Sequence, residues 1–308
     1  MYNVAAYITA YEDPEAVNSC IAAIKKQSYP VKKIFIVDNS SKYPLDITQY
    51  EDSNIIVEFY PDNIGVAGGL DLGIRWAIGE DYDFLWTFDQ DSIPKFDALE
   101  KLLINYEKRS QEGYTIGIIA PLPVDVNSQI EIHGGFFNKY KFTPAAKFED
   151  DKGFYECDIV ITSGSLVALA VAKEVEIPNK NLFIDAVDWV YCMNFKTKGY
   201  SVILVNNAIM KHNFGNYIKV KSILKRNKIL FNSYSPLRYY YIYRNHTFVE
   251  TRLSQGIYTI ISVIYRIKVL IKNVLRILFY EPDFALLKAW AAILGTFDGL
   301  CGKLGKTW

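Results

Sequence analysis

The sequence predicts an α/β protein built on a mostly parallel, doubly wound sheet flanked by helices, and three observations predict it. Between residues 4 and 124, short apolar runs alternate with amphipathic segments of helical length, as strands and crossover helices do in such sheets. Half of the 308 residues are hydrophobic and 22% are charged, a composition that supports a large core. Polar or small residues follow these apolar runs, as expected at the ligand-binding edge of the sheet.

The predicted elements follow in order along the chain. Residues 4–11 form the first strand, and Asp13 and Pro14 then begin a helix, with Asp13 as its N-cap. Further strands are predicted at 33–37, 54–60, 84–88 and 115–124, and helices at 68–78 and 96–108. Later segments are a β-like stretch at 159–170, an acidic helical segment at 182–200 and a strand at 202–209.

The strand predicted at 84–88 ends abruptly in the sequence Asp89, Gln90, Asp91, and Pro94 should prevent much further pairing. Two carboxylates one residue apart can share a hard divalent cation and the oxygens of a phosphate. A pair of solvated turn aspartates is the simpler interpretation of this motif alone. The neighbouring predicted strands also end in polar or small residues, however, and together they favour one crevice, lined by Thr9, Tyr11, Asp38, Asn39, Asn63 and Gly65.

A glycine-rich stretch, NIGVAGGLDLG at 63–73, accompanies the predicted helix at 68–78. It lacks the G-K-[ST] of a Walker loop and the G-x-G-x-x-G of a dinucleotide-binding fingerprint. Gly65, Gly68 and Gly69 could bring the backbone close to an anionic ligand at the helix N-terminus. Tight packing between strand and helix explains the same glycines equally well.

A second acidic pair, Asp185 and Asp188, lies in the segment FIDAVDWVYCMNFKTKGY at 183–200. If a helix begins there, residues three apart lie near one face of its first turn. Helix capping alone would also account for acids at this position.

The last third of the chain has a different character. From Lys211 to Lys306 it holds 16 Lys or Arg residues against 4 Asp or Glu, about +12, so the net charge of zero leaves about −12 on the remainder. We therefore expect a first domain at 1–218, a basic helical region at 219–308, and an anionic surface as a partner of that region. Arg238 and Arg244 lie in a predicted helix there, and two arginines could hold a pyrophosphate.

The apolar segment at 257–280 is interrupted by four charges, which exclude a comfortable transmembrane span. A basic amphipathic helix lying in the membrane interface suits this segment, and docking on the protein with snorkelling lysines is the alternative. The four cysteines are scattered, as in a reducing compartment, and the first strand begins too early for a signal peptide. We expect a cytoplasmic protein, peripherally associated with the inner face of the plasma membrane.

Taken together, these segments resemble family-2 glycosyltransferases of the GT-A fold over roughly residues 3–250. The resemblance rests on Thr9 and on VDNSS at 37–41, DNIGVAGG at 62–69 and FDQDSIP at 88–94. TSGSL at 162–166 and VDWVYCMNFKTKGY at 187–200 resemble the acceptor and base segments of the family. With DQDS in place of the commoner D-D-D, and RYYYIYRN at 238–245, the chain is most similar to bacterial rhamnosyltransferases. These enzymes build surface polysaccharides such as O-antigen on lipid-linked acceptors.

The resemblance implies a role for each matched residue. The nucleotide-sugar donor would contact Thr9, Tyr11, Asp38, Asn63, Gly68, Asp89, Gln90, Arg238 and Arg244. A cofactor ion, Mg²⁺ or Mn²⁺, would be held by Asp91, Asp89 and His212. Asp188 would be the catalytic base, although Val187 stands where the family has a Glu, and Asp185 is the second candidate. The acceptor would contact Ser163, Gly164 and Trp189.

The implied activity is an inverting transfer of a sugar, rhamnose from dTDP-rhamnose as the first choice, to a saccharide or lipid-linked acceptor. Alternatives are another donor (UDP-galactofuranose, UDP-hexose or UDP-N-acetylhexosamine) or a non-catalytic subunit that binds nucleotide or polysaccharide. A nucleotidyltransferase would need an N-terminal glycine-rich loop with Arg and Lys, which residues 4–14 lack. Expected partners are the donor, the acceptor and a membrane surface, with a homodimer as a further association and no nucleic acid.

Overall fold

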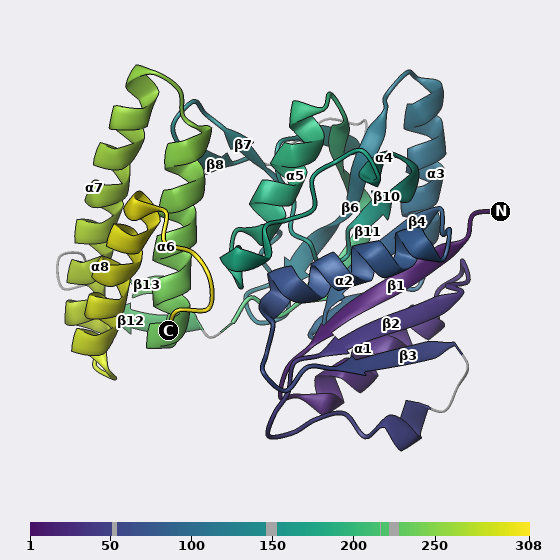
Figure 1. The fold of residues 1–308 in the computed structure, drawn as a ribbon, viewed down its shortest axis with the longest axis horizontal. Coiled ribbons are helices and arrows are strands. Elements are labelled where there is room, and N and C mark those ends of the chain that lie inside the picture. The colour runs from purple at the N-terminus through teal and green to yellow at the C-terminus, as the bar shows by residue number, and fades with distance from the viewer. Residues whose placement is uncertain (51–53, 146–152, 216, 222–227) are drawn as a thin grey trace. The chain divides into compact units, whose positions relative to one another are not determined.

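The computed structural model describes residues 1–50, 54–145, 153–215, 217–221 and 228–308 (Figure 1). The chain forms two compact units. The first, which we call the sheet unit, comprises Met1–Phe136, Pro144–Phe183 and Val187–Asn213. The second, which we call the helical unit, comprises Phe137–Thr143, Ile184–Ala186 and Phe214–Trp308.

The sheet unit is organised around one mixed sheet, whose described strands run in the order β3-β2-β1-β4-β10-β6-β11-β5, with β9 paired to β11. Parallel pairs join β3, β2, β1 and β4, and another joins β6 to β11. β10 lies antiparallel between β4 and β6. The strands are β1 (Val4–Ala10), β2 (Lys33–Asp38), β3 (Ile55–Phe59), β4 (Phe84–Asp89), β5 (Ser92–Pro94), β6 (Ile116–Asp125), β9 (Phe154–Cys157), β10 (Leu166–Ala168) and β11 (Ser201–His212).

The strand order turns around β1, because β2 pairs on one side of it and β4 on the other. Ligands in open α/β sheets gather beyond the carboxyl ends of the strands at such a point. The register places the ends together: Thr9 lies opposite Asp89, and Ala10 lies opposite Asp38. The expected α/β architecture is therefore confirmed, although the sheet is mixed rather than mostly parallel. The ends of β1, β2 and β4 lie side by side, as the predicted crevice requires.

Helices cover both faces of this sheet (Figure 1). On one face, the buried residues of α1 and α3 join Ala6 and Ile8 of β1 in a single core cluster. On the other face, α2 packs so closely on Tyr7 that an added Cβ at Gly69 or Gly73 would lie about 2.5 Å from that side chain. The helical elements of the unit are α1 (Pro14–Lys25), η1 (Ile47–Tyr50), α2 (Gly65–Gly79), α3 (Ala98–Gln111), α4 (Leu169–Ala172), η2 (Lys180–Leu182) and α5 (Val187–Thr197).

The first two helices begin in different ways. The Asp13 carboxylate accepts the N–H of Ala16 and caps α1, as predicted. α2 begins at Gly65, three residues earlier than expected, and its N-cap residue makes no side-chain cap hydrogen bond. Just before this helix, the Asn63 side chain accepts the Gly65 N–H at 2.9 Å. Gly65 has a φ of +74°, a conformation that favours glycine.

The structure corrects three other expectations. Pro94 does not end pairing: β5 forms antiparallel contacts with β11, and as the last strand of the sheet it tolerates the missing N–H. The stretch 159–170 contains only the short strand β10, followed directly by α4. Asp185 lies outside α5, which begins at Val187, because Asp185 and Ala186 have positive φ angles of 68° and 58°.

The helical unit is built from three helices, α6 (Pro236–Leu253), α7 (Ile257–Tyr280) and α8 (Ala285–Cys301), with a β-hairpin of β12 (Tyr217–Lys221) and β13 (Lys228–Asn232). A further hairpin, β7 (Gly135–Phe137) and β8 (Phe142–Pro144), spans the boundary of the two units in sequence. α8 approaches α6 closely at Gly295 and Gly299, where an added Cβ would lie 2.3 Å from the carbonyl oxygens of Tyr240 and Arg244.

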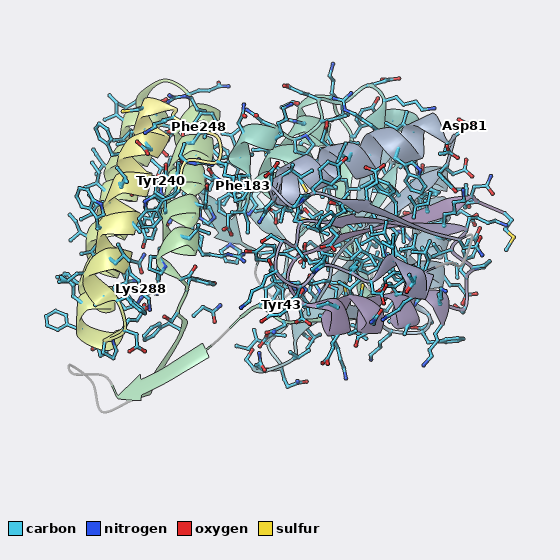
Figure 2. The ribbon with its side chains drawn as sticks, turned by 60° about the horizontal axis from the view of Figure 1, so that its bottom comes forward. Tyr43, Asp81, Phe183, Tyr240, Phe248 and Lys288 are labelled. Carbon is cyan, nitrogen blue, oxygen red and sulfur yellow. The ribbon has the colours of Figure 1, made fainter. Side chains whose placement is uncertain are left out.

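Figure 2 shows the side chains of both units, with Tyr240 and Lys288 labelled in the helical unit. Both side chains are buried there, so the helices enclose polar groups as well as aromatic rings. Within the described residues, none of the helices combines the length and the apolar composition that crossing a membrane requires.

Candidate functional site

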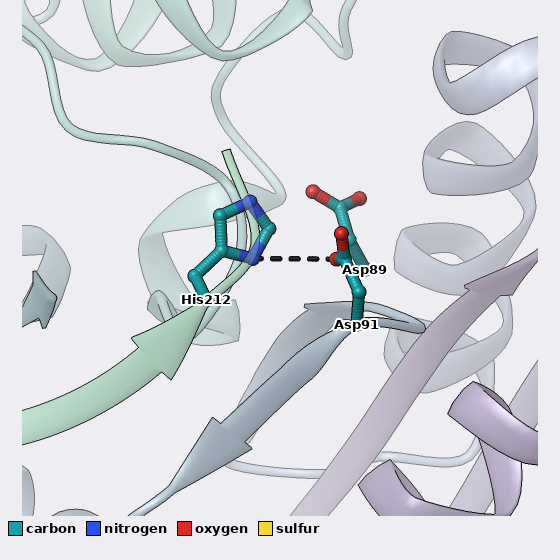
Figure 3. Close-up of side chains that lie close together, drawn as sticks. All are labelled: Asp89, Asp91 and His212. Atoms are coloured by element: carbon teal, nitrogen blue, oxygen red, sulfur yellow. Dashed lines mark ion pairs between the residues drawn. The ribbon is translucent and has the colours of Figure 1, made fainter. Parts of the chain in front are cut away.

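Asp89, Asp91 and His212 form a three-residue group at the edge of the sheet (Figure 3). Each offers one ligand atom, and these atoms all lie within 4.8 Å of one another. β4 ends at Asp89, and the antiparallel pairing of β5 with β11 places His212 opposite Ser92. The pairing that Pro94 was expected to prevent is therefore what brings the histidine to the two aspartates.

Hydrogen bonds beneath this group orient the histidine. His212 Nδ1 lies 2.7 Å from the Ser92 hydroxyl and 3.3 Å from Asp91 Oδ1. Ser92 also lies 2.5 Å from the hydroxyl of Ser163, which accepts the backbone N–H of Asp89 at 3.0 Å. A hydrogen bond at Nδ1 selects the tautomer of the ring and favours Nε2 as the atom that binds a cation.

These residues fit a divalent cation by the chemistry of their donor atoms. Carboxylate oxygens are the ligands that Mg²⁺ and Mn²⁺ prefer, and an imidazole nitrogen suits a transition metal. Asp89 and Asp91 are partly exposed whereas His212 is buried, so an ion here would keep one side open to a ligand. The group can thus join a cation to an anionic ligand.

Gln90, between the two aspartates, ties their loop to the end of β1. Its side-chain oxygen accepts the Tyr11 N–H at 2.6 Å, and its amide donates to the Tyr11 carbonyl at 3.0 Å. These two hydrogen bonds hold the loop after β4 against the loop after β1. The Tyr11 side chain itself is 52% exposed, and Thr9 is buried with its hydroxyl 2.7 Å from that of Tyr7.

Asp38, at the end of β2, is buried, and its two oxygens accept the N–H groups of Ser40 and Leu45 at 2.9 and 2.7 Å. These bonds shape the loop after β2. The next residue, Asn39, accepts the Ile64 N–H at 2.9 Å and so links this loop to the start of α2.

The glycine-rich stretch serves packing at several positions. Gly65 lies against the Phe183 backbone, and Gly69 lies against Tyr7, so neither tolerates a side chain. An added Cβ at Gly68 would meet only the side chain of Ile64 in its own helix. The Asn63 side chain lies at the start of α2, where it accepts the Gly65 N–H. Gly68 is thus the buried glycine of this turn whose added Cβ would meet the mildest hindrance.

Asp188 lies in the first turn of α5, where the helix dipole favours an ionised carboxylate. Its Oδ1 lies 3.0 Å from the backbone N–H of Trp189, which donates to it. Asp188 is also among the residues that line a small cavity, together with Thr87 of β4, Thr162 and Tyr191. The cavity lies on the α2 side of the sheet, since Leu70 of that helix also lines it.

The TSGSL segment is fastened to β4. The Trp86 indole N–H donates to the Gly164 carbonyl at 2.8 Å, and the Gly164 N–H donates to the Thr87 carbonyl at 2.7 Å. Gly164 has a φ of +78°, and an added Cβ would lie 2.6 Å from the sulfur of Met210. Gly164 and the buried Ser163 therefore act at least as parts of the scaffold under Asp89.

The remaining candidates lie in the helical unit. Arg238 forms an ion pair with Asp185 at 3.2 Å, and the Asn245 side chain donates to the carbonyls of Ile184 and Asp185. Arg244 is fully buried, and its guanidinium donates to Asn245 and to the Gly305 carbonyl.

Two contributors were not found from the sequence: Ser92 and Glu12. Glu12 accepts the backbone N–H groups of Lys42, Ser41 and Tyr43, and these bonds lower the pKa of its carboxyl. Ser92 was the easiest to find, because it directly follows the two aspartates and a hydroxyl there can reach a neighbouring ligand. No local signal distinguishes Glu12, since its role depends on a loop about 30 residues away in the chain.

The chain is similar to several known proteins. One relative is the dTDP-rhamnosyl transferase RfbF of Shigella flexneri, to which the chain is 25% identical over 305 residues. The match covers 98% of this chain and 97% of that relative. The chain is similar in fold to GalNAc-T7, solved with UDP, GalNAc and Mn²⁺, at a TM-score of 0.56 and 11% identity over 70% of this chain. S. aureus TarS matches over 82% of this chain at 15% identity and a TM-score of 0.49. The chain spans less than half the length of these two solved structures, 44% and 40%.

The fold similarity supports a GT-A-like arrangement of sheet and helices. The profile of the family described as Glycosyl transferase family 2 matches residues 6–164, slightly more than half of the chain. That range contains Asp38, Asn63, Asp89 and Asp91, whose strand ends line the crevice of the sheet unit. The chain belongs to glycosyl transferase family 2.

Proposed function

We propose that the protein is an inverting glycosyltransferase that moves rhamnose from dTDP-rhamnose to a saccharide or lipid-linked acceptor. One observation carries the choice of donor: the similarity to the Shigella dTDP-rhamnosyl transferase extends over 98% of this chain and 97% of that relative. Such coverage includes the helical unit as well as the residues of the crevice. The acceptor would belong to a growing surface polysaccharide such as O-antigen.

The donor occupies the crevice at the carboxyl ends of β1, β2 and β4. Asp38, Thr9 and Tyr11 contact the nucleotide base, and Asn63 and Gly68 approach the ribose and phosphates. Gln90 shapes this site through its two hydrogen bonds to the Tyr11 backbone. Support comes from the register, which places Thr9 beside Asp89 and Ala10 beside Asp38.

Asp91, Asp89 and His212 would hold Mg²⁺ or Mn²⁺. The bound cation would offset the charge that develops on the departing nucleoside diphosphate. Ser92 keeps the His212 ring in its binding orientation, and Ser163 holds the Asp89 backbone. Arg238 and Arg244 are further candidates for contacting the diphosphate, and their substitution one at a time would test each. The full burial of Arg244 and its bonds to Asn245 and Gly305 favour a structural role for it.

Asp188 is the proposed base. The acceptor hydroxyl oxygen forms a bond to the anomeric carbon while the bond from that carbon to the diphosphate oxygen breaks, and the hydroxyl proton passes to the Asp188 carboxylate. Its place in the first turn of α5 and on the wall of a small cavity supports this role. Asp185 is the second candidate, and its ion pair with Arg238 favours a structural role for it.

The acceptor is proposed to contact Ser163, Gly164 and Trp189. A lipid-linked acceptor would place the enzyme on the cytoplasmic, inner face of the plasma membrane as a peripheral protein. Two alternatives remain. The donor could be a UDP-sugar in place of dTDP-rhamnose, or the protein could bind nucleotide or polysaccharide without catalysing transfer.

A donor panel tests the proposal. The full chain is mixed with Mg²⁺ or Mn²⁺ and dTDP-rhamnose, UDP-galactofuranose, a UDP-hexose or a UDP-N-acetylhexosamine, and thermal shift and donor hydrolysis are recorded. We expect the largest response with dTDP-rhamnose and its loss when the metal is chelated. A response confined to a UDP-sugar would replace the donor, and no response to any donor would favour the non-catalytic alternative.

A further inference from the structure

The helix α7 has its polarity reversed relative to an ordinary surface helix. Ser262 and Arg266 are buried against the other helices of the unit, and Arg266 pairs there with Glu250 at 3.3 Å. The outward face is mostly apolar along the length of the helix, with the exposed Lys268 and Lys272 on or beside it. Its members at helical spacing are each more than half exposed: Ile257, Ile260, Ile264, Ile271 and Leu275. A soluble surface helix would place these side chains inside and the charges outside.

The next helix, α8, repeats the reversal. Lys288 and Asp298 are buried, and Lys288 donates to the buried Glu281 at 3.0 Å. Leu286 and Trp290, in contrast, are 80% and 55% exposed. Contiguous exposed apolar surface on this scale marks an interaction site rather than a solvated face.

Charge narrows the choice of partner. Among the described side chains of the helical unit, the acids are largely withdrawn from solvent: Glu250, Glu281 and Asp298 are each no more than 4% exposed, Asp185 is partly buried, and Asp283 is the exposed one. The exposed charges that remain are mostly positive and include, on or near α7 and α8, Lys268, Lys272, Lys303 and Lys306. The surface is therefore apolar and cationic together.

We infer that the outward faces of α7 and α8 dock on a membrane surface that carries anionic headgroups. The isoleucine, leucine and tryptophan side chains enter the interface between headgroups and acyl chains. Lys268 and Lys272 lie on or beside the apolar stripe of α7, where long lysine stems can follow the apolar surface while the ammonium groups reach phosphates. The buried ion pairs hold the three helices together without placing acids at the membrane.

A second copy of the chain fits this surface less well. A symmetric pair would bring the lysines of α7 from both copies together, and only Asp283 is exposed among the acids at 236–308, because Glu250, Glu281 and Asp298 are buried within each copy. An anionic lipid surface instead supplies many negative charges at the depth that lysine ammonium groups reach. The inference deepens the proposed location at the membrane and rests on the proposed function only in that respect.

Vesicle flotation of the full chain tests the inference, without nucleotide-sugar or metal, so that its outcome is separate from that of the donor panel. Phosphatidylcholine vesicles are compared with vesicles containing phosphatidylglycerol. Ile271→Glu should weaken binding to the anionic vesicles about tenfold, because a charge enters the apolar stripe. Ile104→Glu is the matched control: Ile104 lies on α3 of the sheet unit, and both isoleucines are 56% exposed. Circular dichroism of both variants checks that they fold.

Lys268→Glu combined with Lys272→Glu should remove both the preference for anionic vesicles and the salt dependence of binding. Lys198→Glu on the sheet unit is the control and should leave both unchanged. Equal loss in Ile271→Glu and Ile104→Glu, or no wild-type binding to either vesicle, would overturn the inference. Light scattering tests whether the surface binds a second copy of the chain instead. A stable wild-type dimer that fails to bind vesicles and dissociates in Ile271→Glu would assign the surface to a second copy instead.

Discussion

The sheet unit and the helical unit distribute polar and apolar residues in opposite ways. In β4 of the sheet unit, Trp86 and Phe88 are buried and the acids follow at the end of the strand. In the helical unit, Arg266 and Lys288 are buried while Ile264 and Trp290 are exposed. The first arrangement gathers polar groups at the carboxyl end of a strand, where ligands bind in α/β sheets. The second leaves apolar side chains exposed and keeps its charges in buried ion pairs, which fits the membrane contact proposed above. The two units therefore place their charged groups differently: at the end of a strand in one and inside the helix packing in the other.

The largest effect should come from removing the proposed base in the sheet unit. Asp188→Asn preserves the shape of the side chain but cannot accept the acceptor proton, so we expect the transfer rate to fall by about 10² to 10⁴. Nucleotide binding, measured by calorimetry, should stay close to wild type. Asp185→Asn is the companion variant. If it abolishes transfer while Asp188→Asn remains active, Asp185 is the base.

A buried cation of the helical unit should matter for stability rather than for turnover. Lys288→Met keeps the length of the side chain but leaves Glu281 without its 3.0 Å ion pair, so urea unfolding should show a loss of about 3 kcal/mol or more. Arg75→Met removes an ion pair of 2.9 Å in α2, where the arginine side chain is 65% exposed, and should cost at most about 1 kcal/mol. Equal costs at the two positions would refute the contrast between the units.

In the sheet unit, a smaller effect is expected from Ser92, which lies beside His212 and tests how the proposed metal site is oriented. Ser92→Ala removes the hydroxyl at His212 Nδ1, and Mn²⁺ affinity, measured by titration of the free protein, should fall about tenfold to a hundredfold. Ser165→Ala is the control, since that buried hydroxyl donates to the Ile161 carbonyl instead. Unchanged affinity in Ser92→Ala would mean that the histidine is oriented by other contacts.

Acid should affect the helical unit through His246, whose pKa is lowered to about 3 by burial and by the nearby Arg266 and Arg238. The unfolded chain takes up this proton near pH 6.5, whereas the folded chain does not. Stability is therefore full above about pH 6.5 and falls with pH towards 3, by about tenfold in the folding equilibrium per pH unit. Comparing the pH dependence of urea unfolding with that of His246→Phe isolates this contribution, and parallel profiles would contradict it.

Much of the fold and site was predictable because strands, caps and strand ends are local features. The alternation of elements, the Asp13 cap and the acids after β4 depend on residues within a few positions of one another. The chain also shows from its composition that the last third is basic and amphipathic. Asp89, Asp91 and His212 were grouped only through the resemblance to a family.

The tertiary structure alone decided how distant segments meet. The pairing of β5 with β11 joins Ser92 to His212 across 120 residues of sequence, and no local pattern reports such a register. Likewise, helical periodicity identifies two faces of α7 but not which of them is buried. Tertiary packing decides which face is buried. Arg266 of α7 points inward, where it pairs with the buried Glu250 of α6, and the isoleucines of α7 are exposed.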